Sequence, residues 1–260
     1  MKCLLINLDR SSDRLVHCER EFNKVSVLFS RVSAVDASDL DEDFIDSIRL
    51  HDDWPKQTVA EFACFISHRK CWEIIANGDQ SFGAVFEDDV ILSPDSNNYL
   101  KDFSWIPDGI DVVKLETMKE ISLYRRFGFS IANRKLHKII SFQAGAAGYI
   151  ISKKFAVDIL RITENYLPAP VDHFLFDPRL EVMQRYVAYQ LIPALCIQDC
   201  IVNRGEQTHQ SLIGTVRSVE GMKLKKIKLS HFQKFKRETT RIFLKLYKSF
   251  MQKLMIVDFQ

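Results

Sequence analysis

The chain has 260 residues, 47% of them hydrophobic, and a formal net charge of +2. It is long and apolar enough to fill the core of one large domain, so it should fold without disulfide bonds. Its six cysteines form no CxxC pair and no zinc-type Cys/His spacing, which favours reduced thiols in a reducing compartment. The N-terminal apolar stretch is too short for a signal peptide, and no apolar run approaches the ~20 residues that span a bilayer. We therefore expect a cytoplasmic protein, either soluble or attached to a membrane surface.

The charge is unevenly distributed along the chain. Residues 222–260 carry 11 Lys and Arg against two Asp and Glu, which leaves 25 basic and 32 acidic residues in 1–221. The two parts therefore have net charges of +9 and −7. This asymmetry predicts a folded, acidic body over residues 1–221 and a basic C-terminal tail over residues 222–260.

The first elements of the chain predict an α/β fold. Residues 3–8 (CLLINL) form a continuous apolar run, as expected for a strand that is covered on both faces. Ser11 or Ser12 can then cap a helix, and residues 27–37 (VLFSRVSAVDA) have the composition of a second strand. A strand, a helix and a strand in succession favour a mainly parallel sheet.

The strongest helix signal covers residues 58–78 (TVAEFACFISHRKCWEIIANG). Thr58 and Glu61 have the spacing of a capping box, apolar residues recur at helical spacing, and Asn77-Gly78 ends the helix. Further along the chain, the sequence predicts a strand through residues 84–92, strands at 111–117 and 189–199, a glycine-lined turn, strand and helix at 144–160, and a proline-punctuated loop at 166–178.

Three consecutive acids, Glu87, Asp88 and Asp89, stand between the apolar runs 84–86 and 90–92. Ionised carboxylates are costly to bury unless a cation compensates them, so the protein must supply arginines or bind a metal. Side chains alternate along a strand, so if the extended geometry persists, Glu87 and Asp89 lie on one face and Asp88 on the other. Two oxygen donors on one face suit Mg²⁺ or Mn²⁺, with diphosphate oxygens and water as further ligands. The alternative is that the acids merely start a surface loop.

Seven blocks of the sequence form a recognisable set. In chain order they are LLINLDRSSDR, EFACFISHRKCW, AVFEDDVIL, VVKLETM, AGYIISKKFA, PVDHFLF and PALCIQD. Together they resemble glycosyltransferase family 25, and within it the bacterial lipooligosaccharide galactosyltransferases, over about residues 3–215. The resemblance implies a GT-A-type fold with a single Rossmann-like domain, a UDP-galactose or UDP-glucose donor, a divalent cation (Mn²⁺ or Mg²⁺) and inversion at the anomeric carbon. None of these details follows from composition or spacing.

The resemblance also implies roles for the acids. Asp89, the last acid of its motif, is expected to bind the metal directly, with Glu87 on the metal or the ribose and Asp88 supporting them in the donor site. Asp172 matches the family's PvD block and is the expected catalytic base, opposite the leaving group. Glu116 is the second candidate base. Two structural alternatives stay open, since Asp172 can cap a short helix and Glu116 can pair with an arginine.

The donor nucleotide is expected at the first junction between strand and helix. Leu8, Arg10 and Arg14 lie there, beside a helix N-terminus, although the two arginines can equally be a solvated surface pair. His68 matches the family's Ser-His pair and is a further candidate for the donor site. It can instead be a hydrogen-bonded core histidine.

Two other parts of the site are expected later in the chain. In the glycine-lined turn, Gly145 and Gly148 can border the donor sugar or form a plain tight turn. A third metal ligand often comes from late in a GT-A domain, where His209 and Gln198 are the candidates.

From residue 222 onward, the sequence predicts an amphipathic helix. Its apolar residues form one stripe surrounded by lysines and arginines, which is the pattern of a helix that lies on an anionic membrane. Each basic residue near such a surface contributes on the order of 1 kcal/mol to binding. The stripe can instead pack onto the folded body, or the charges can bind nucleic acid. Nucleic acid is the least favoured partner, because the body is acidic and the aromatic residues share one face.

The sequence therefore predicts a metal-dependent, inverting glycosyltransferase that moves galactose from UDP-galactose to a terminal sugar of lipooligosaccharide or lipopolysaccharide. We expect it on the cytoplasmic side of the bacterial inner membrane, held at the surface by its basic tail. The same reaction with UDP-glucose is the nearest alternative. A metal-dependent phosphoesterase and a membrane-bound nucleotide-binding scaffold are the alternatives from other classes.

Overall fold

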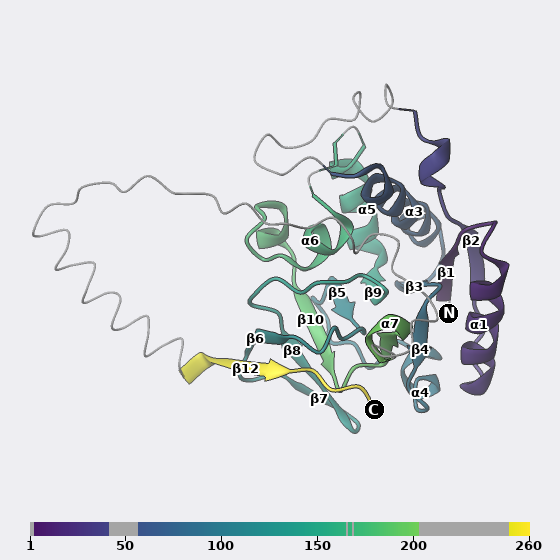
Figure 1. The fold of residues 1–260 in the computed structure, drawn as a ribbon. Coiled ribbons are helices and arrows are strands. Elements are labelled where there is room, and N and C mark those ends of the chain that lie inside the picture. Colours follow the sequence, from purple (N-terminus) through teal and green to yellow (C-terminus); the bar gives the residue numbers. More distant parts are fainter. Residues whose placement is uncertain (1–2, 42–56, 165, 168, 203–249) are drawn as a thin grey trace, which may run out of the picture.

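The computed structural model describes residues 3–41, 57–164, 166–167, 169–202 and 250–260 (Figure 1). An eight-stranded sheet forms its centre. In spatial order its strands are β2 (Ser30–Ser33), β1 (Cys3–Asn7), β3 (Phe82–Glu87), β9 (Gly148–Ser152), β5 (Val112–Lys114), β10 (Ala188–Ile192), β8 (Arg134–Lys138) and β7 (Phe129–Ile131).

Most strands of this sheet point in the same direction. The pairs β1–β2, β1–β3 and β5–β10 are parallel. Strand β9 is antiparallel to both β3 and β5, and β8 is antiparallel to both β10 and β7. Within the sheet, β9 and β8 therefore run against the direction shared by the other six strands. The predicted α/β domain with a mainly parallel sheet is confirmed.

Each face of the sheet carries its own core, and β1 shows why. All five of its residues are buried, and successive side chains point to opposite faces. Leu4 packs in the core under α3 (Val59–Ala76) and α5 (Lys153–Ile162), whereas Leu5 packs with residues of α1 (Ser12–Lys24). The prediction of a strand covered on both faces is therefore confirmed.

Helix α3 begins where the sequence predicts. Oγ1 of Thr58 accepts from the backbone N–H of Glu61 at 3.2 Å, and the Glu61 carboxylate accepts from the backbone N–H of Thr58 at 2.9 Å. This confirmed capping box fixes the first turn. The helix then buries Phe62, Phe65 and Trp72 and packs beside α5 (Figure 1). Its rotation about its own axis is thereby set, and so is the side on which His68 lies.

The segment 189–199 forms two strands where the sequence predicts one. The first is β10, and the second is β11 (Cys196–Gln198), which leaves the large sheet and pairs antiparallel with β4 (Val90–Leu92). Pro193, in a cis peptide bond with Ile192, separates them, because proline has no N–H for a strand ladder. The other short elements are η1 (Ala37–Asp39), α4 (Asn97–Leu100), α6 (Val171–Phe176), η2 (Val182–Arg185) and α7 (Asp199–Val202).

The C-terminal residues pack onto the body as a strand. β12 (Gln252–Ile256) is antiparallel to β6 (Ile121–Arg125). The prediction of a helix from residue 222 onward is therefore wrong for Gln252–Ile256, because the edge of β6 satisfies the backbone groups of this segment. The part of the tail at 222–249 lies outside the described residues. None of the described helices is both long and apolar enough to cross a membrane.

Candidate active site

The three acids lie where β3 ends. Glu87 is the last residue of β3, Asp88 and Asp89 form a turn, and Val90 starts β4. In the parallel pairing of β1 and β3, Ile6 lies opposite Glu87, so the turn sits at the carboxyl edge of both strands. Ligands of open α/β sheets bind at this edge.

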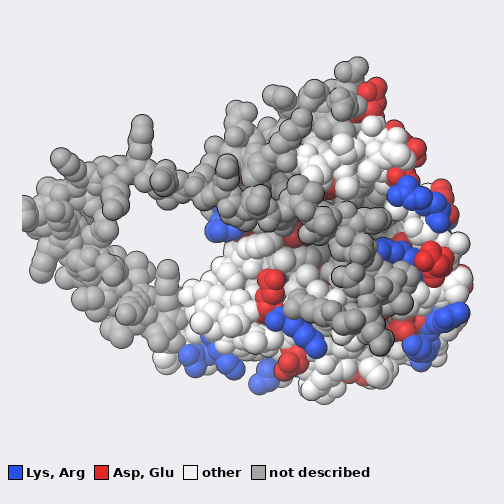
Figure 2. Space-filling view, in the orientation of Figure 1, with Lys and Arg blue, Asp and Glu red and all other residues white. Residues whose placement is uncertain are grey.

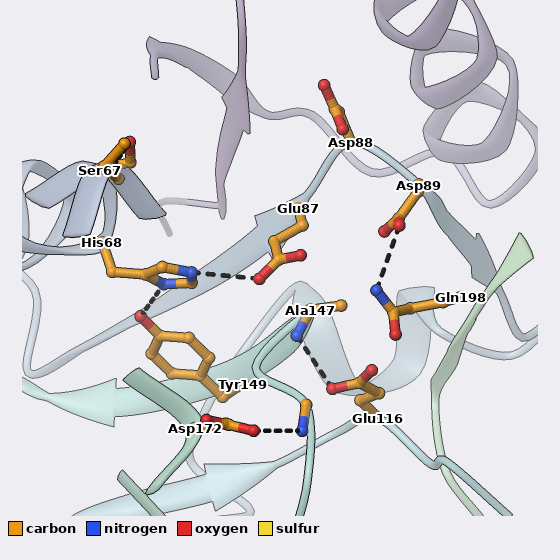
Figure 3. Close-up of polar contacts among 12 residues, drawn as sticks. Ser67, His68, Glu87, Asp88, Asp89, Glu116, Ala147, Tyr149, Asp172 and Gln198 are labelled. Atoms are coloured by element: carbon orange, nitrogen blue, oxygen red, sulfur yellow. Dashed lines mark hydrogen bonds and ion pairs between the residues drawn. The ribbon is translucent and has the colours of Figure 1, made fainter. Parts of the chain in front are cut away.

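Asp88 holds the acidic turn to the first strand and helix. Its Oδ2 accepts from Nδ2 of Asn7 at 2.7 Å, and its Oδ1 accepts from Nη1 of Arg14 at 2.9 Å. The arginine thus compensates the charge of Asp88, and it is not a solvated surface residue. Asp88 points away from Glu87 and Asp89 (Figure 3). The turn at Asp88 and Asp89 interrupts the strand predicted through residues 84–92, so the turn and not strand alternation sets these directions.

Glu87 ends a chain of buried hydrogen bonds. Its Oε1 lies 3.2 Å from Nε2 of His68, and Nδ1 of His68 lies 2.8 Å from the Tyr149 hydroxyl, which accepts from Nε1 of Trp72 at 2.8 Å. Trp72 can only donate, so every group is satisfied when the Tyr149 hydroxyl donates to Nδ1 and His68 donates from Nε2 to Glu87. Burial lowers the pKa of His68 to about 3, which makes it a neutral donor.

The fully buried His68 has no surface for a donor molecule in this structure. We predicted it in the donor site with a core histidine as the alternative, and the structure supports the alternative. His68 acts on the acidic cluster through its bond to Glu87.

Asp89 is the most poorly satisfied acid of the cluster. Its Oδ2 accepts from Nε2 of Gln198 at 3.1 Å, while its Oδ1 is buried without a hydrogen-bond partner. Burial, and next repulsion from Glu87, raise the pKa of Asp89 to about 7. Burial, and next repulsion from Glu116, also raise the pKa of Glu87, although 27% of the Glu87 side chain remains exposed. A cation between Glu87 and Asp89 would relieve both effects.

Glu116 follows β5 and reaches toward the same space (Figure 3). Its Oε2 accepts from the backbone N–H of Ala147 at 2.9 Å and from Nζ of Lys114 at 3.1 Å. The partner of Glu116 is therefore a lysine, where we considered an arginine. Its Oε1 is buried without a hydrogen-bond partner, as Oδ1 of Asp89 is. Oε1 of Glu116 and Oδ1 of Asp89 therefore both remain available for a bound group.

The glycine-lined turn fits closely around Glu116. Gly145 has a φ of +83°, and a Cβ atom there would lie 2.7 Å from both carboxylate oxygens of Glu116. Lys114 donates to the carbonyl of Ala144 at 2.9 Å and also to the carbonyl of Gly145. Glycine is therefore required at 145 for both backbone conformation and space. Glycine is required at 148 for a different reason, since a Cβ there would overlap with Sγ of Cys196 in β11.

Asp172 lies in the first turn of α6 beside this glycine. Its Oδ2 accepts from the backbone N–H of Gly145 at 3.2 Å, and its Oδ1 accepts from the backbone N–H of His173 at 2.8 Å. The structure thus brings Asp172 to the same turn that encloses Glu116, which places the two candidate bases next to each other. The capping alternative is wrong, because the N-cap of α6 is Pro170 and Asp172, inside the first turn, accepts within its helix only from the N–H of the next residue.

The remaining predicted residues are spread around the site. Leu8 follows β1, and its carbonyl accepts from the backbone N–H of Ser11. Arg10 is largely exposed and pairs with Asp36, outside the acidic cluster. Gln198 lies beside Asp89, to whose Oδ2 it donates from Nε2. His209 lies outside the described residues.

A second group of possible metal ligands contains Cys64, His68 and Glu87. Their ligand atoms lie within 4.8 Å of one another. We do not favour a metal there, because both nitrogens of His68 are already hydrogen-bonded. Burial also raises the pKa of the Cys64 thiol far above its ordinary value, which opposes formation of the thiolate that a metal binds.

The sequence matches the model of glycosyltransferase family 25, described as LPS biosynthesis protein, over residues 1–175. The chain belongs to glycosyltransferase family 25. It is similar to the lipooligosaccharide biosynthesis protein lic2B of Haemophilus influenzae, with 29% identity over 209 residues and 75% of each chain covered. It is also similar to the lacto-N-neotetraose biosynthesis glycosyltransferase LgtB of Neisseria gonorrhoeae, with 30% identity over 208 residues, covering 75% of this chain and 73% of that one.

Among solved structures, this family 25 chain is similar to a glycosyltransferase involved in the glycosylation of the major capsid of PBCV-1. The TM-score is 0.38 and the identity 10%, with 76% of this chain and 93% of that chain covered. The family match itself runs from β1 into α6 and includes all four acids that meet at the site, Glu87, Asp89, Glu116 and Asp172.

Sequence reasoning missed the residues that hold the acids in place. These are Asn7, Lys114, Trp72 and Tyr149. Two of them carried a readable signal, since Asn7 ends an apolar run and Lys114 interrupts one. A lysine inside a buried strand requires a partner. Trp72 and Tyr149 look like ordinary core aromatics, and only their mutual hydrogen bond reveals their role.

Proposed function

We propose that this glycosyltransferase moves a galactosyl group from UDP-galactose to a terminal sugar of lipooligosaccharide or lipopolysaccharide, with inversion at the anomeric carbon. The observation that carries the proposal is the placement of Glu87 and Asp89 at the carboxyl edge of the sheet, with Oδ1 of Asp89 buried and without a hydrogen-bond partner. The names of the lipooligosaccharide and lacto-N-neotetraose biosynthesis relatives support the class of acceptor. UDP-glucose is the second candidate donor, because the two sugars differ at one hydroxyl group.

The acidic cluster fits a divalent cation such as Mn²⁺ or Mg²⁺. The residues that would hold it are Asp89, through its unpartnered Oδ1, and Glu87, with Gln198 beside them. All are oxygen donors, which these hard cations prefer. When bound, the cation would offset the negative charge that grows on the departing diphosphate.

Asp172 is the proposed catalytic base. Each of its oxygens accepts one backbone N–H, which fixes the carboxylate and leaves lone pairs for an acceptor hydroxyl. The hydroxyl passes its proton to Asp172 while its oxygen forms the bond to the anomeric carbon. The bond from that carbon to the diphosphate oxygen breaks, and its electron pair leaves with UDP. Glu116 is the second candidate, because Lys114 already compensates its charge.

The basic tail supports a place at the inner face of the bacterial inner membrane. Residues 222–249 contain ten Lys and Arg and one Glu. Such a segment is attracted by anionic lipid headgroups. A lipid-linked acceptor would be met at the same surface.

The test is UDP release together with product mass. Purified protein would be supplied with UDP-galactose or UDP-glucose, with Mn²⁺ or EDTA, and with or without an oligosaccharide acceptor. We expect an acceptor-dependent gain in mass by one hexose, which EDTA abolishes and Asp89→Asn reduces. Asp108→Asn, a change at an exposed site, is the matched control and should behave as the unmodified protein.

Each other outcome has a definite meaning. Equal cleavage of the donor without acceptor would favour the phosphoesterase alternative. UDP binding that survives Asp172→Asn, with no turnover on any acceptor, would favour a binding scaffold. Full activity in EDTA would remove the cation from the proposal.

A further inference from the structure

The β6–β12 pair has one face in the core and one face in solvent. Directly opposite residues of an antiparallel pair share a face, and Ile121 is opposite Ile256 while Leu123 is opposite Leu254. The alternate residues Ser122 and Tyr124 point the other way and are buried. Ile121, Leu123, Leu254 and Ile256 therefore form one outer apolar face.

This outer face is unusually exposed. Ile121, Leu254 and Ile256 are 68%, 66% and 51% exposed. At its end, the exposed rings of Phe127 and Phe250 lie 6.2 Å apart between centroids. With Phe129, these residues make up six of the eleven exposed large hydrophobic residues of the described chain. A concentration of this kind marks an interaction surface.

The charges at one end of the outer face are basic. Arg125 ends β6 on this face, opposite Gln252, and Arg126 follows it, whereas the exposed acids Glu120 and Asp258 lie near the other end. Basic side chains gather at the edge of the molecule where β12 begins (Figure 2). The ten Lys and Arg of residues 222–249 directly precede this strand in the sequence. Exposed apolar side chains beside basic ones, preceded by a strongly basic segment, are complementary to an anionic lipid surface.

The two-stranded ribbon formed by β6 and β12 is also joined to the candidate active site. Oγ1 of Thr117, the residue after Glu116, donates to the carbonyl of Val257 at 2.7 Å. Val257 and Glu116 line the same small cavity beside β6. The backbone of Ala194 donates to the carbonyl of Asp258 at 2.7 Å. A partner surface that binds the ribbon would therefore be held next to the candidate active site.

We propose that the outer face of the β6–β12 ribbon is a docking surface for an anionic lipid bilayer. Ile121, Leu254 and Ile256 insert at the level of the headgroups, while Arg125 and Arg126 contact lipid phosphates. The ten Lys and Arg of residues 222–249, against one Glu, favour an anionic lipid surface over a second copy of this chain. The inference deepens the proposed function, since it rests on a lipid-linked acceptor for its biological sense. The binding itself requires no turnover.

The experiment is co-sedimentation of the full-length protein with vesicles. One set of vesicles is phosphatidylcholine alone, and the other contains phosphatidylglycerol. We expect binding to the anionic vesicles that weakens with salt. The triple variant Ile121→Thr, Leu254→Thr and Ile256→Thr places β-branched residues, which favour strands, at all three positions and should bind on the order of tenfold more weakly or worse. Val16→Thr with Leu28→Thr, two exposed apolar residues outside the ribbon, is the matched control and should bind normally.

The outcomes separate this surface from its competitors. Unchanged binding of the triple variant would overturn the proposal and assign lipid binding to another part of the chain. If the unmodified protein does not bind anionic vesicles, the proposal is overturned as well. If the same three changes dissociate a dimer, the outer face is a contact between two copies of the chain. Activity on a soluble oligosaccharide should be equal in the unmodified protein and the triple variant. Loss of activity in both would count against the proposed function and leave the vesicle result standing.

Discussion

Nε2 of His68 lies 3.2 Å from Oε1 of Glu87, and this contact links the helix-bound core of the protein to its acidic cluster. The histidine belongs to α3, and its other nitrogen is held by Tyr149. Three buried side chains, Trp72, Tyr149 and His68, thus fix the orientation of one carboxylate. Rigid support of this kind is what a metal-binding carboxylate needs.

Replacing His68 should weaken metal binding. In His68→Ala, Glu87 loses its neutral donor, and we expect a loss of about 10- to 100-fold in Mn²⁺ affinity or activity. The Mn²⁺ concentration that gives half-maximal activity is the measurement. His68→Gln, which keeps an N–H donor, should recover part of the loss. His137→Ala removes a buried histidine that bonds to the Arg125 carbonyl, and an equal effect there would argue against a specific role for His68.

Gly145 and Gly109 form a natural comparison. Both have positive φ, +83° and +79°, but a Cβ at Gly109 would meet nothing within 4 Å, whereas one at Gly145 would press on Glu116. Both alanine variants should lose about 1–2 kcal/mol from left-handed strain. Only Gly145→Ala should also lose activity, because Glu116 and the turn bonded to Asp172 must move. Denaturant unfolding and turnover, measured side by side, would check this; equal turnover in the two variants would contradict it.

Asp89 should make the stability of the metal-free protein dependent on pH. Its pKa is raised from 3.8 to about 7 in the folded state, so the folded protein holds this proton more tightly than the unfolded chain. Stability should therefore fall as the pH rises from about 4 to about 7. Asp89→Asn should make this part of the profile less steep without flattening it, because the pKa of Glu87 is also raised, to about 8. Added Mn²⁺ should restore the stability at higher pH. Melting temperatures across this range, with EDTA and with Mn²⁺, test the sign.

Lys114 and Glu116 should depend on each other for stability. Both side chains are buried, and Lys114→Met would leave Glu116 with an uncompensated charge. We expect a loss of about 3–5 kcal/mol for the single variant. Lys114→Met combined with Glu116→Gln should be clearly more stable than the single variant. A double-mutant cycle by chemical denaturation measures the coupling, and strictly additive effects would show that the pair is not coupled.

The elements of the fold that the sequence predicted correctly are those set by residues close together in the chain. The apolar run of β1 and the Thr58–Glu61 capping box are both confirmed, because each is specified within a few positions. The failure at Gln252–Ile256 has the opposite cause. Its residues have a helical pattern, but the edge of β6, more than a hundred positions away, pairs with them. Distant pairing overrode the local pattern.

The sequence by itself determined the class of fold, the family and the position of the acidic motif at the end of a strand, since these follow from periodicity and from motifs in order. Only the tertiary structure decided the partner of each acid. Asp88 meets Asn7 across 81 positions, and Asp89 meets Gln198 across 109. Such partners are set by strand register and helix rotation, because a shift of one residue turns every side chain of a strand to the other face. The outer face of the β6–β12 ribbon arises in the same way, from the pairing of two segments that are far apart in the chain.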